Sequence, residues 1–110
     1  MAFGNNAKAA AGGAVAMGNG SQARGKWAVA IGNNAQAKGE GSRALGVNSY
    51  AVGLNSIAMG WESNAREDSS IAIGTDSDSV QKNSIAIGNR AVSNAEDSVC
   101  LLYTSPSPRD

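Results

Sequence analysis

The chain has 110 residues, which is enough for one domain at most. Hydrophobic residues make up 42% of it, but aromatic residues only 5%, so a conventional globular core lacks its bulky side chains. Nine basic and nine acidic residues balance to a net charge of zero, which excludes nucleic acid and anionic membranes as favoured partners.

A repeat of fourteen residues organises the chain from its first residues onward. An alanine stands two positions before every repeat glycine, from Ala2 to Ala86, and a large apolar residue stands directly before it, from Phe3 to Ile87. The repeat glycines are Gly4, Gly18, Gly32, Gly46, Gly60, Gly74 and Gly88. Seven copies in phase indicate a solenoid, in which each repeat is one turn of a stack.

The second half of each repeat alternates as well. Alanine or serine stands three and five residues after the glycine, and polar residues such as Gln22, Arg24 and Lys38 stand between and beyond them. Alternation with period two is typical of strands. Each unit therefore predicts a strand, a glycine turn, a second strand and a second turn.

Two short strands in every fourteen residues predict an all-β fold, a two-sided parallel β-roll. Seven coils spaced ~4.8 Å apart would extend about 34 Å. We expect the two large apolar residues of one strand to face two small residues of the other inside the roll. A lone coil buries too little to be stable, so stacking is obligatory.

The small residues also suggest an interface. In this assignment the alanine column and the serines before it lie on the face opposite the large residues, where long polar side chains never occur. We therefore predict that another subunit's backbone packs against this strip. The alternative places the Ile and Val face on the subunit axis and the small residues inside a thinner roll. The serines are Ser42, Ser56, Ser70 and Ser84.

The units SSIAIGTDSDS, NSIAIGNRAVS and WAVAIGNNAQA resemble the head repeats of YadA-like trimeric autotransporter adhesins. The resemblance covers residues 1–99. It implies a single-stranded left-handed parallel β-roll that assembles as a homotrimer on the bacterial cell surface. A stalk and an outer-membrane anchor would lie in regions missing from this chain.

Function is also implied by the resemblance. Family heads attach to extracellular-matrix proteins or host cells, or bind one another in cell–cell agglutination. Their contacts are spread over repeated surfaces, so no ligand-binding residue is assigned here. A passive structural spacer or a phage tail-fibre segment is the alternative, whereas an ice-binding solenoid would need a threonine ladder and the repeats contain only Thr75.

The last eleven residues depart from the repeat. Period fourteen predicts glycine at 102, but the chain reads Cys100, Leu101, Leu102 and then YTSPSPRD, with both prolines of the chain. CLLYTSPSPRD resembles the translation of a sequencing-library transposase adaptor. We therefore predict that residues 1–99 are head repeats truncated at both ends and that residues 100–110 are non-native read-through.

Motifs with possible chemistry have simpler explanations in the repeat. GNGSQA at Gly18 and GEGSRA at Gly39 match a dinucleotide-binding pattern, which also requires a following helix. Asp76 and Asp78 suggest a calcium loop but lack the further oxygen ligands. There is no histidine, and the only cysteine lies in the tail, so the chain lacks the residues that catalytic triads and zinc sites require. The sequence predicts a protein that is not an enzyme, without catalytic residues, metal, cofactor or small-molecule substrate.

Four residues stand out against the repeat. Trp27, Trp61 and Tyr50 fall outside the interior columns, at turns or on the outer strand, and exposed aromatics are common interface anchors. We expect them to pack along a coil edge or between subunits more often than to contact a ligand. Arg43 would carry its charge inside a regular coil, so we expect an irregular coil there, with the side chain escaping at an edge or a subunit junction.

Overall fold

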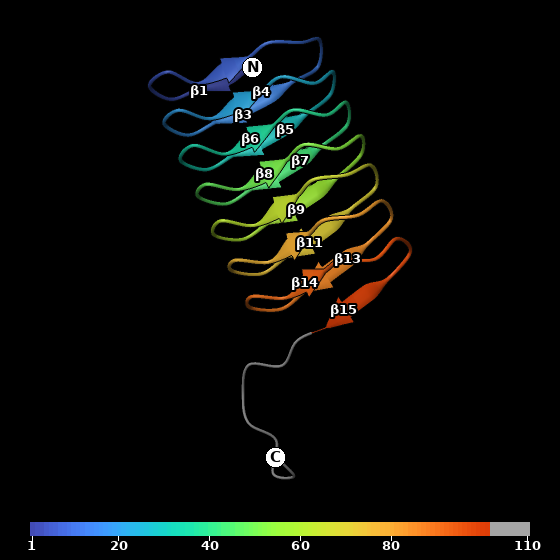
Figure 1. The fold of residues 1–110 in the computed structure, drawn as a ribbon. Coiled ribbons are helices and arrows are strands. Elements are labelled where there is room, and N and C mark those ends of the chain that lie inside the picture. Colours follow the sequence, from blue (N-terminus) through green and yellow to red (C-terminus); the bar gives the residue numbers. More distant parts are fainter. Residues whose placement is uncertain (102–110) are drawn as a thin grey trace.

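The structure, a computed structural model, describes residues 1–101. Two parallel sheets face each other and run along a stack of coils (Figure 1). The first sheet contains β1 (Ala2–Phe3), β3 (Val15–Met17), β5 (Val29–Ile31), β7 (Arg43–Leu45), β9 (Ile57–Met59), β11 (Ile71–Ile73), β13 (Ile85–Ile87) and β15 (Val99–Leu101). The second sheet contains β2 (Lys8–Ala9), β4 (Gln22–Ala23), β6 (Gln36–Ala37), β8 (Tyr50–Ala51), β10 (Asn64–Ala65), β12 (Asp78–Ser79) and β14 (Val92–Ser93). None of the described residues forms a helix that could cross a membrane.

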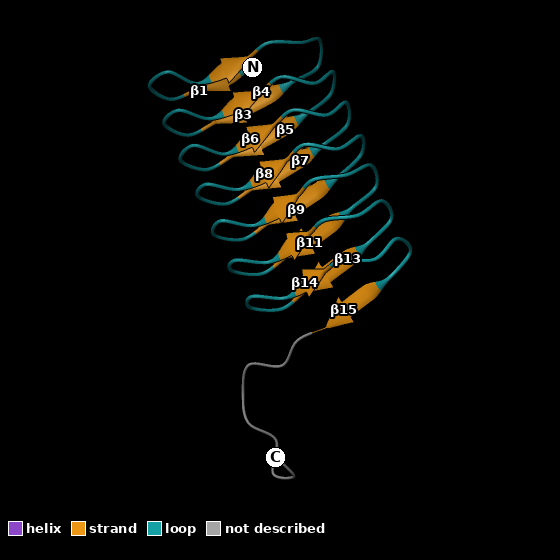
Figure 2. Ribbon diagram, viewed as in Figure 1, coloured by secondary structure: helices purple, strands orange, loops and turns teal. Residues whose placement is uncertain are grey.

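In both sheets, each strand residue pairs with the residue fourteen positions away in the neighbouring coil. Ala58 of β9 pairs with Ala72 of β11, and Asn64 of β10 pairs with Asp78 of β12. Each coil is bonded to both neighbours: for example, the Ile71 amide donates to the Ser84 carbonyl at 2.9 Å. Turns separate the strands at both edges of the stack (Figure 2). The predicted order of strand, glycine turn, strand and turn is confirmed, as is the parallel β-roll.

The repeat glycine is required both by its backbone conformation and by the next coil. Gly60 has a φ of 124°, where a side chain would be strained. A Cβ atom on Gly60 would also lie 2.6 Å from the Gly74 carbonyl oxygen, too close for a real contact. A different reason applies to Gly53 at the other turn, where a Cβ atom would collide with the Glu67 carbonyl oxygen. Glycine therefore allows consecutive coils to approach closely at both edges.

From β3 to β14, the interior of the roll is filled by alanine and serine, and Cys100 follows in the alanine column of β15. Ala58 of β9 and Ala65 of β10 are both completely buried, as are Ser56 and Ser63 beside them. The same four positions are buried in the neighbouring coils. No large side chain is completely buried between the two sheets among the described residues.

This arrangement corrects our preferred assignment of the interior. The large apolar residues point outward from the first sheet, and Met17, Ile31, Met59 and Ile87 are each 37–39% exposed. The alanine column that we expected on a subunit interface is inside instead. The thinner roll, stated above as the alternative, is the observed one, because two closely spaced sheets accommodate only short side chains on their facing sides.

Arg43 is corrected for the same reason. Its column lies on the outer side of the first sheet, so the guanidinium is exposed without any distortion of its coil. β7 pairs in register with β5 and β9, with Arg43 opposite Val29 and Ile57. The expected irregularity of this coil was wrong.

The hydroxyl groups of the buried serines donate hydrogen bonds to nearby backbone carbonyl groups. Ser56 Oγ donates to the Gly53 carbonyl at 2.7 Å, and Ser63 Oγ donates to the Gly60 carbonyl at 3.1 Å. In a later coil, Ser79 Oγ donates to the Ser84 carbonyl at 2.8 Å. A buried hydroxyl without a partner would be costly, so these bonds make serine an acceptable filler beside alanine. They also tie each turn to the strand that follows it.

The final strand extends past the predicted end of the repeats. In β15, Cys100 pairs with Ala86 and Leu101 pairs with Ile87, so both residues continue the ladder of the first sheet. The rest of the predicted read-through segment, residues 102–110, lies outside the described residues. A domain boundary between residues 99 and 100 stays a proposal.

A larger side chain in the interior column should be poorly tolerated. We expect Ala58→Val to lower the free energy of unfolding by about 1–3 kcal/mol, because the added methyl groups have no space between the sheets. Urea denaturation followed by circular dichroism measures this. Ala10→Val makes the same chemical change at an exposed position and should stay within about 0.5 kcal/mol of the unaltered protein. Equal effects of the two substitutions would contradict the observed interior.

Candidate binding surfaces

The outer side of the first sheet forms one continuous apolar surface. The apolar face, as we call it, consists of the outward side chains of β3, β5, β7, β9, β11 and β13. Eleven of its twelve residues are Val, Ile, Leu or Met, and the twelfth is Arg43. The isoleucines of β11, Ile71 and Ile73, are only half-buried by the chain's own atoms. Soluble monomers rarely expose apolar patches of this extent, so the face indicates a contact with another molecule.

Arg43 lies in the middle of this apolar face. No carboxylate within residues 1–101 lies within 4 Å of its guanidinium, since the one ion pair in this range joins Arg66 to Asp78. A charge among half-exposed Val and Ile side chains keeps its hydration only while the face stays open. Any partner that covers the face must therefore solvate or pair this guanidinium.

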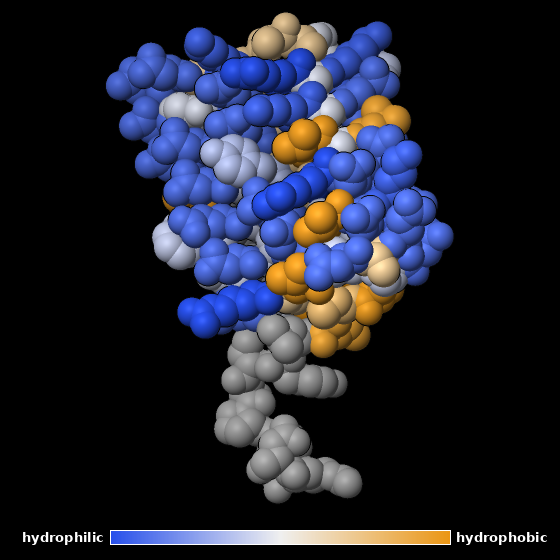
Figure 3. All heavy atoms as spheres, viewed as in Figure 1, coloured by the Kyte–Doolittle hydropathy of each residue, from blue (hydrophilic) through white to orange (hydrophobic). Residues whose placement is uncertain are grey.

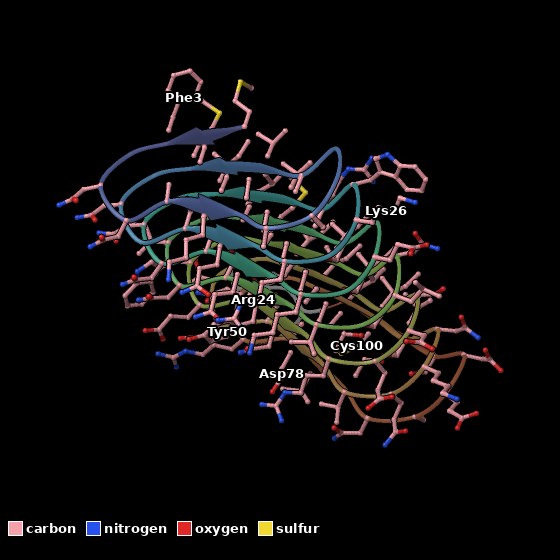
Figure 4. All side chains as sticks on the ribbon, turned by 90° about the horizontal axis from the view of Figure 1, so that it is seen from above. Phe3, Arg24, Lys26, Tyr50, Asp78 and Cys100 are labelled. Atoms are coloured by element: carbon pink, nitrogen blue, oxygen red, sulfur yellow. The ribbon has the colours of Figure 1, made fainter. Side chains whose placement is uncertain are left out.

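The outer side of the second sheet is polar and is hollowed in two adjacent places. One hollow of about 390 Å³ is lined by Asn48, Tyr50, Glu62, Asn64, Asp76 and Asp78. The other, of about 490 Å³, is lined by Gln36, Lys38, Tyr50, Val52, Asn64 and Arg66. Because Tyr50 and Asn64 line both, we treat the two hollows as one charged groove. Seen down the stack, Tyr50 and Asp78 lie on one side of the roll, and Phe3, at the end of the first sheet, projects from the other (Figure 4).

The repeat separates the charges of this groove into two rims. Glu62 and Asp76 occupy the same turn position in consecutive coils, whereas Lys38 and Arg66 occupy a position four residues later, just beyond the second strand. Four residues of fully extended chain span about 13 Å, and because Glu62 lies in a turn with a φ of 57°, the rims are at most about 13 Å apart. Tyr50 of β8 and Asn64 of β10 lie between them. The groove therefore has an acidic rim, a basic rim and a floor with one aromatic ring.

The acidic rim contains carboxylates in close contact. A hydrogen bond to Asp76, followed by burial and the negative charge of Asp76, raises the pKa of Glu62. Burial also raises the pKa of Asp78, although Arg66 partly offsets this. Asp78 Oδ1 lies 3.3 Å from Arg66 Nε, which is within ion-pair range, but it has no hydrogen-bond partner among the described residues. A cationic group placed at this rim would relieve the repulsion between Glu62 and Asp76.

The aromatic residues are where the sequence placed them. Trp27 and Trp61 lie at turns and are 59% and 50% exposed, and Tyr50 lies on the outer side of β8. The indole of Trp27 covers Gly13 in the preceding coil, where a Cβ atom would collide with it. Lys26 Nζ lies 4.8 Å from the centre of the same ring. Trp27 thus packs along the coil edge, whereas only Tyr50 lies in a hollow.

The motifs considered above do not form cofactor or metal sites in the part of the chain that the structure describes. GNGSQA leads from the turn at Gly18 into the strand β4, and no helix follows it. Asp76 lies in a turn, and Asp78 lies on the outer side of β12 rather than in a loop. Within residues 1–101, no group of three or more His, Cys, Asp or Glu side chains is placed to hold a metal ion.

The groove itself was not predicted from the sequence. Asp76 and Asp78 were compared there with a calcium loop that lacks further ligands, and Lys38 was taken as a polar surface residue. The signal was present in the outward columns, where acidic and basic residues keep to different positions of the repeat. The whole surface is also uneven in polarity: Figure 3 shows a largely hydrophilic face on which hydrophobic residues gather toward one side.

Comparison with known proteins identifies related repeats. The family model of the YadA head domain repeat, which comprises two copies, matches residues 1–21, 23–49, 51–77 and 81–99. The crystal structure of the collagen-binding domain of the Yersinia adhesin YadA is similar, with a TM-score of 0.66 and 33% sequence identity. The similarity covers 90% of this chain and 63% of that one, so this chain spans less than two thirds of the Yersinia domain. No curated protein matches the sequence.

Removal of one charge from the acidic rim should stabilise the fold in a pH-dependent way. A raised pKa means that the folded chain holds the Glu62 proton more tightly than the unfolded chain, so stability falls as pH rises through the titration of Glu62. We expect Glu62→Gln to raise the melting temperature at pH 7, with the difference shrinking as Glu62 becomes protonated at low pH. Thermal unfolding at several pH values measures this. Glu40→Gln, at an exposed turn of another coil, serves as the control, and the same pH profile for both variants would contradict the explanation.

Proposed function

The chain belongs to the YadA head-repeat family, and from this premise we propose that it is the head module of a trimeric adhesin on a bacterial surface. The family and its fold are structural and binding in character rather than enzymatic. In the proposed role, three heads assemble side by side and display their outer surfaces to matrix proteins, host cells or other bacteria. Residues outside this chain would provide the stalk and the outer-membrane anchor.

The uncovered apolar face is the observation that carries the proposal. Burial of the half-exposed side chains of a single coil, such as Ile71 and Ile73, would contribute about 1–3 kcal/mol, at roughly 25 cal/mol per Å² of apolar area. Six consecutive strands repeat this contribution along the stack. A cyclic assembly of three copies covers the face with itself and leaves the second sheets outside. Homotrimerisation through the apolar face is the simplest way to bury it.

A charge placed on the apolar face should prevent assembly. We expect Ile71→Glu to convert the trimer to monomers, because three carboxylates would be brought into an apolar part of the interface, two coils away from the Arg43 guanidiniums that could pair with them. Analytical ultracentrifugation gives the oligomeric state, and circular dichroism reports whether the β-roll is retained.

Val92→Glu is the matched control for this experiment. Val92 lies on the outer side of β14 in the second sheet and is 45% exposed, so the same change there should leave the trimer intact. A monomeric unaltered protein, or a trimer that persists in Ile71→Glu, would count against the proposed interface.

Binding distinguishes an adhesin from a passive spacer. The Yersinia structure is named as a collagen-binding domain. We expect the trimeric head to bind immobilised collagen or another extracellular-matrix protein in a saturable manner, with a Kd in the micromolar range or tighter. Surface plasmon resonance with serum albumin as the reference surface measures this. A well-folded trimer that binds no matrix protein and no host cell would instead be a spacer.

A further inference from the structure

The charged groove lies on the side of the molecule that trimerisation would leave open. Its floor residues Tyr50 and Asn64 project from β8 and β10 of the second sheet, whereas the apolar face belongs to the first sheet. The two sheets are the opposite sides of a roll that is 13 Å thick. A ligand could therefore occupy the groove in the assembled head without competing with the subunit contacts.

The dimensions of the groove fit a single extended polypeptide. Its rims are at most about 13 Å apart, which accommodates no more than one backbone with side chains directed to both sides. The lining residues come from four consecutive coils, from Gln36 to Asp78. Three intervals of ~4.8 Å give a length of about 14 Å, or roughly four extended residues. Tyr50 lies between the two hollows, where its ring can pack against the stem of a ligand side chain.

The charges of the groove specify the kind of polypeptide. Glu62 and Asp76 form the acidic rim. Asp78 lies on the floor in register with Asn64, and its Oδ1 is 3.3 Å from Arg66 Nε. Lys38 and Arg66 form the basic rim, and Arg24 continues it one coil before Lys38. Successive side chains of an extended chain point to opposite sides. Basic residues on one edge of the ligand and acidic residues on the other would match both rims together.

We propose that the charged groove is a ligand-binding site for an extended segment of a matrix protein that carries both basic and acidic side chains. This inference rests on the proposed adhesin function and assigns it a location and a chemistry. A sulfated polysaccharide fits less well, because the carboxylates of Glu62 and Asp76 would repel a polyanion bound to Lys38 and Arg66. Binding of the polypeptide relieves the repulsion between Glu62 and Asp76.

The test neutralises each rim separately in the trimeric head. Immobilised collagen with its triple helix unfolded, so that single chains are available, is the probe, and heparin is the polyanionic comparison. The variants are Glu62→Gln with Asp76→Asn, Lys38→Gln with Arg66→Gln, and Tyr50→Ala. We expect each to weaken collagen binding at least tenfold, with an unchanged oligomeric state and β signal, and we expect binding to weaken as salt concentration rises. Lys26→Gln with Lys82→Gln removes two cations outside the groove and should alter the Kd less than twofold.

The outcomes separate this inference from the function on which it rests. If the unaltered trimer binds collagen and the three groove variants bind equally well, the groove is not the site, while the adhesin function stands. If only the basic-rim variant loses binding and heparin displaces collagen, the groove is a polyanion site and the proposal is overturned. If the unaltered trimer binds neither collagen nor any other matrix protein, the proposed function fails together with the inference.

Discussion

The narrow space between the two sheets is the constraint on which the whole molecule depends. Consecutive coils touch through the repeat glycines at one edge, and the facing sides of the strands carry alanine and serine from β3 to β14. Such an interior buries little apolar area per residue, so inter-coil hydrogen bonds and close contact along the stack hold each coil in place. Completely buried residues such as Ala58 and Ser56 therefore tolerate little change in volume, and fourteen residues close each turn without insertions.

The thin interior also determines which residues lie on the outer sides of the two sheets. Because large apolar side chains cannot enter, they collect on the outer side of the first sheet, where residues such as Ile71 stay half-exposed in a single chain. The outer side of the second sheet has fewer large apolar side chains and carries mainly polar residues. In the proposed assembly, the first sheet contacts other copies and the second is left for ligands.

Repetition has a further consequence for the charged surface. Every outward column places equivalent residues ~4.8 Å apart, so two acidic residues in the same column of neighbouring coils must interact. Glu62 and Asp76 do so, and their contact raises the pKa of Glu62. A globular fold could separate such residues, but a solenoid cannot. Unfavourable contacts of this kind are kept at a cost in stability, which is consistent with a role in binding a cation-bearing partner.

The sequence by itself determined the coil length, the strand order, the parallel pairing and the family, because each depends on the period of fourteen and on the repeat glycines. It also placed Trp27 and Trp61 at turns. It did not determine which side of the first strand faces inward, since alternation defines two sides and the usual preference for burying large residues pointed to the wrong one. Only the tertiary structure decided this, because the separation of the sheets is a property of the assembled coils. The same holds for Arg43, whose charge is compatible with its strand only on the outer side, and for the groove, which is lined by residues of four consecutive coils.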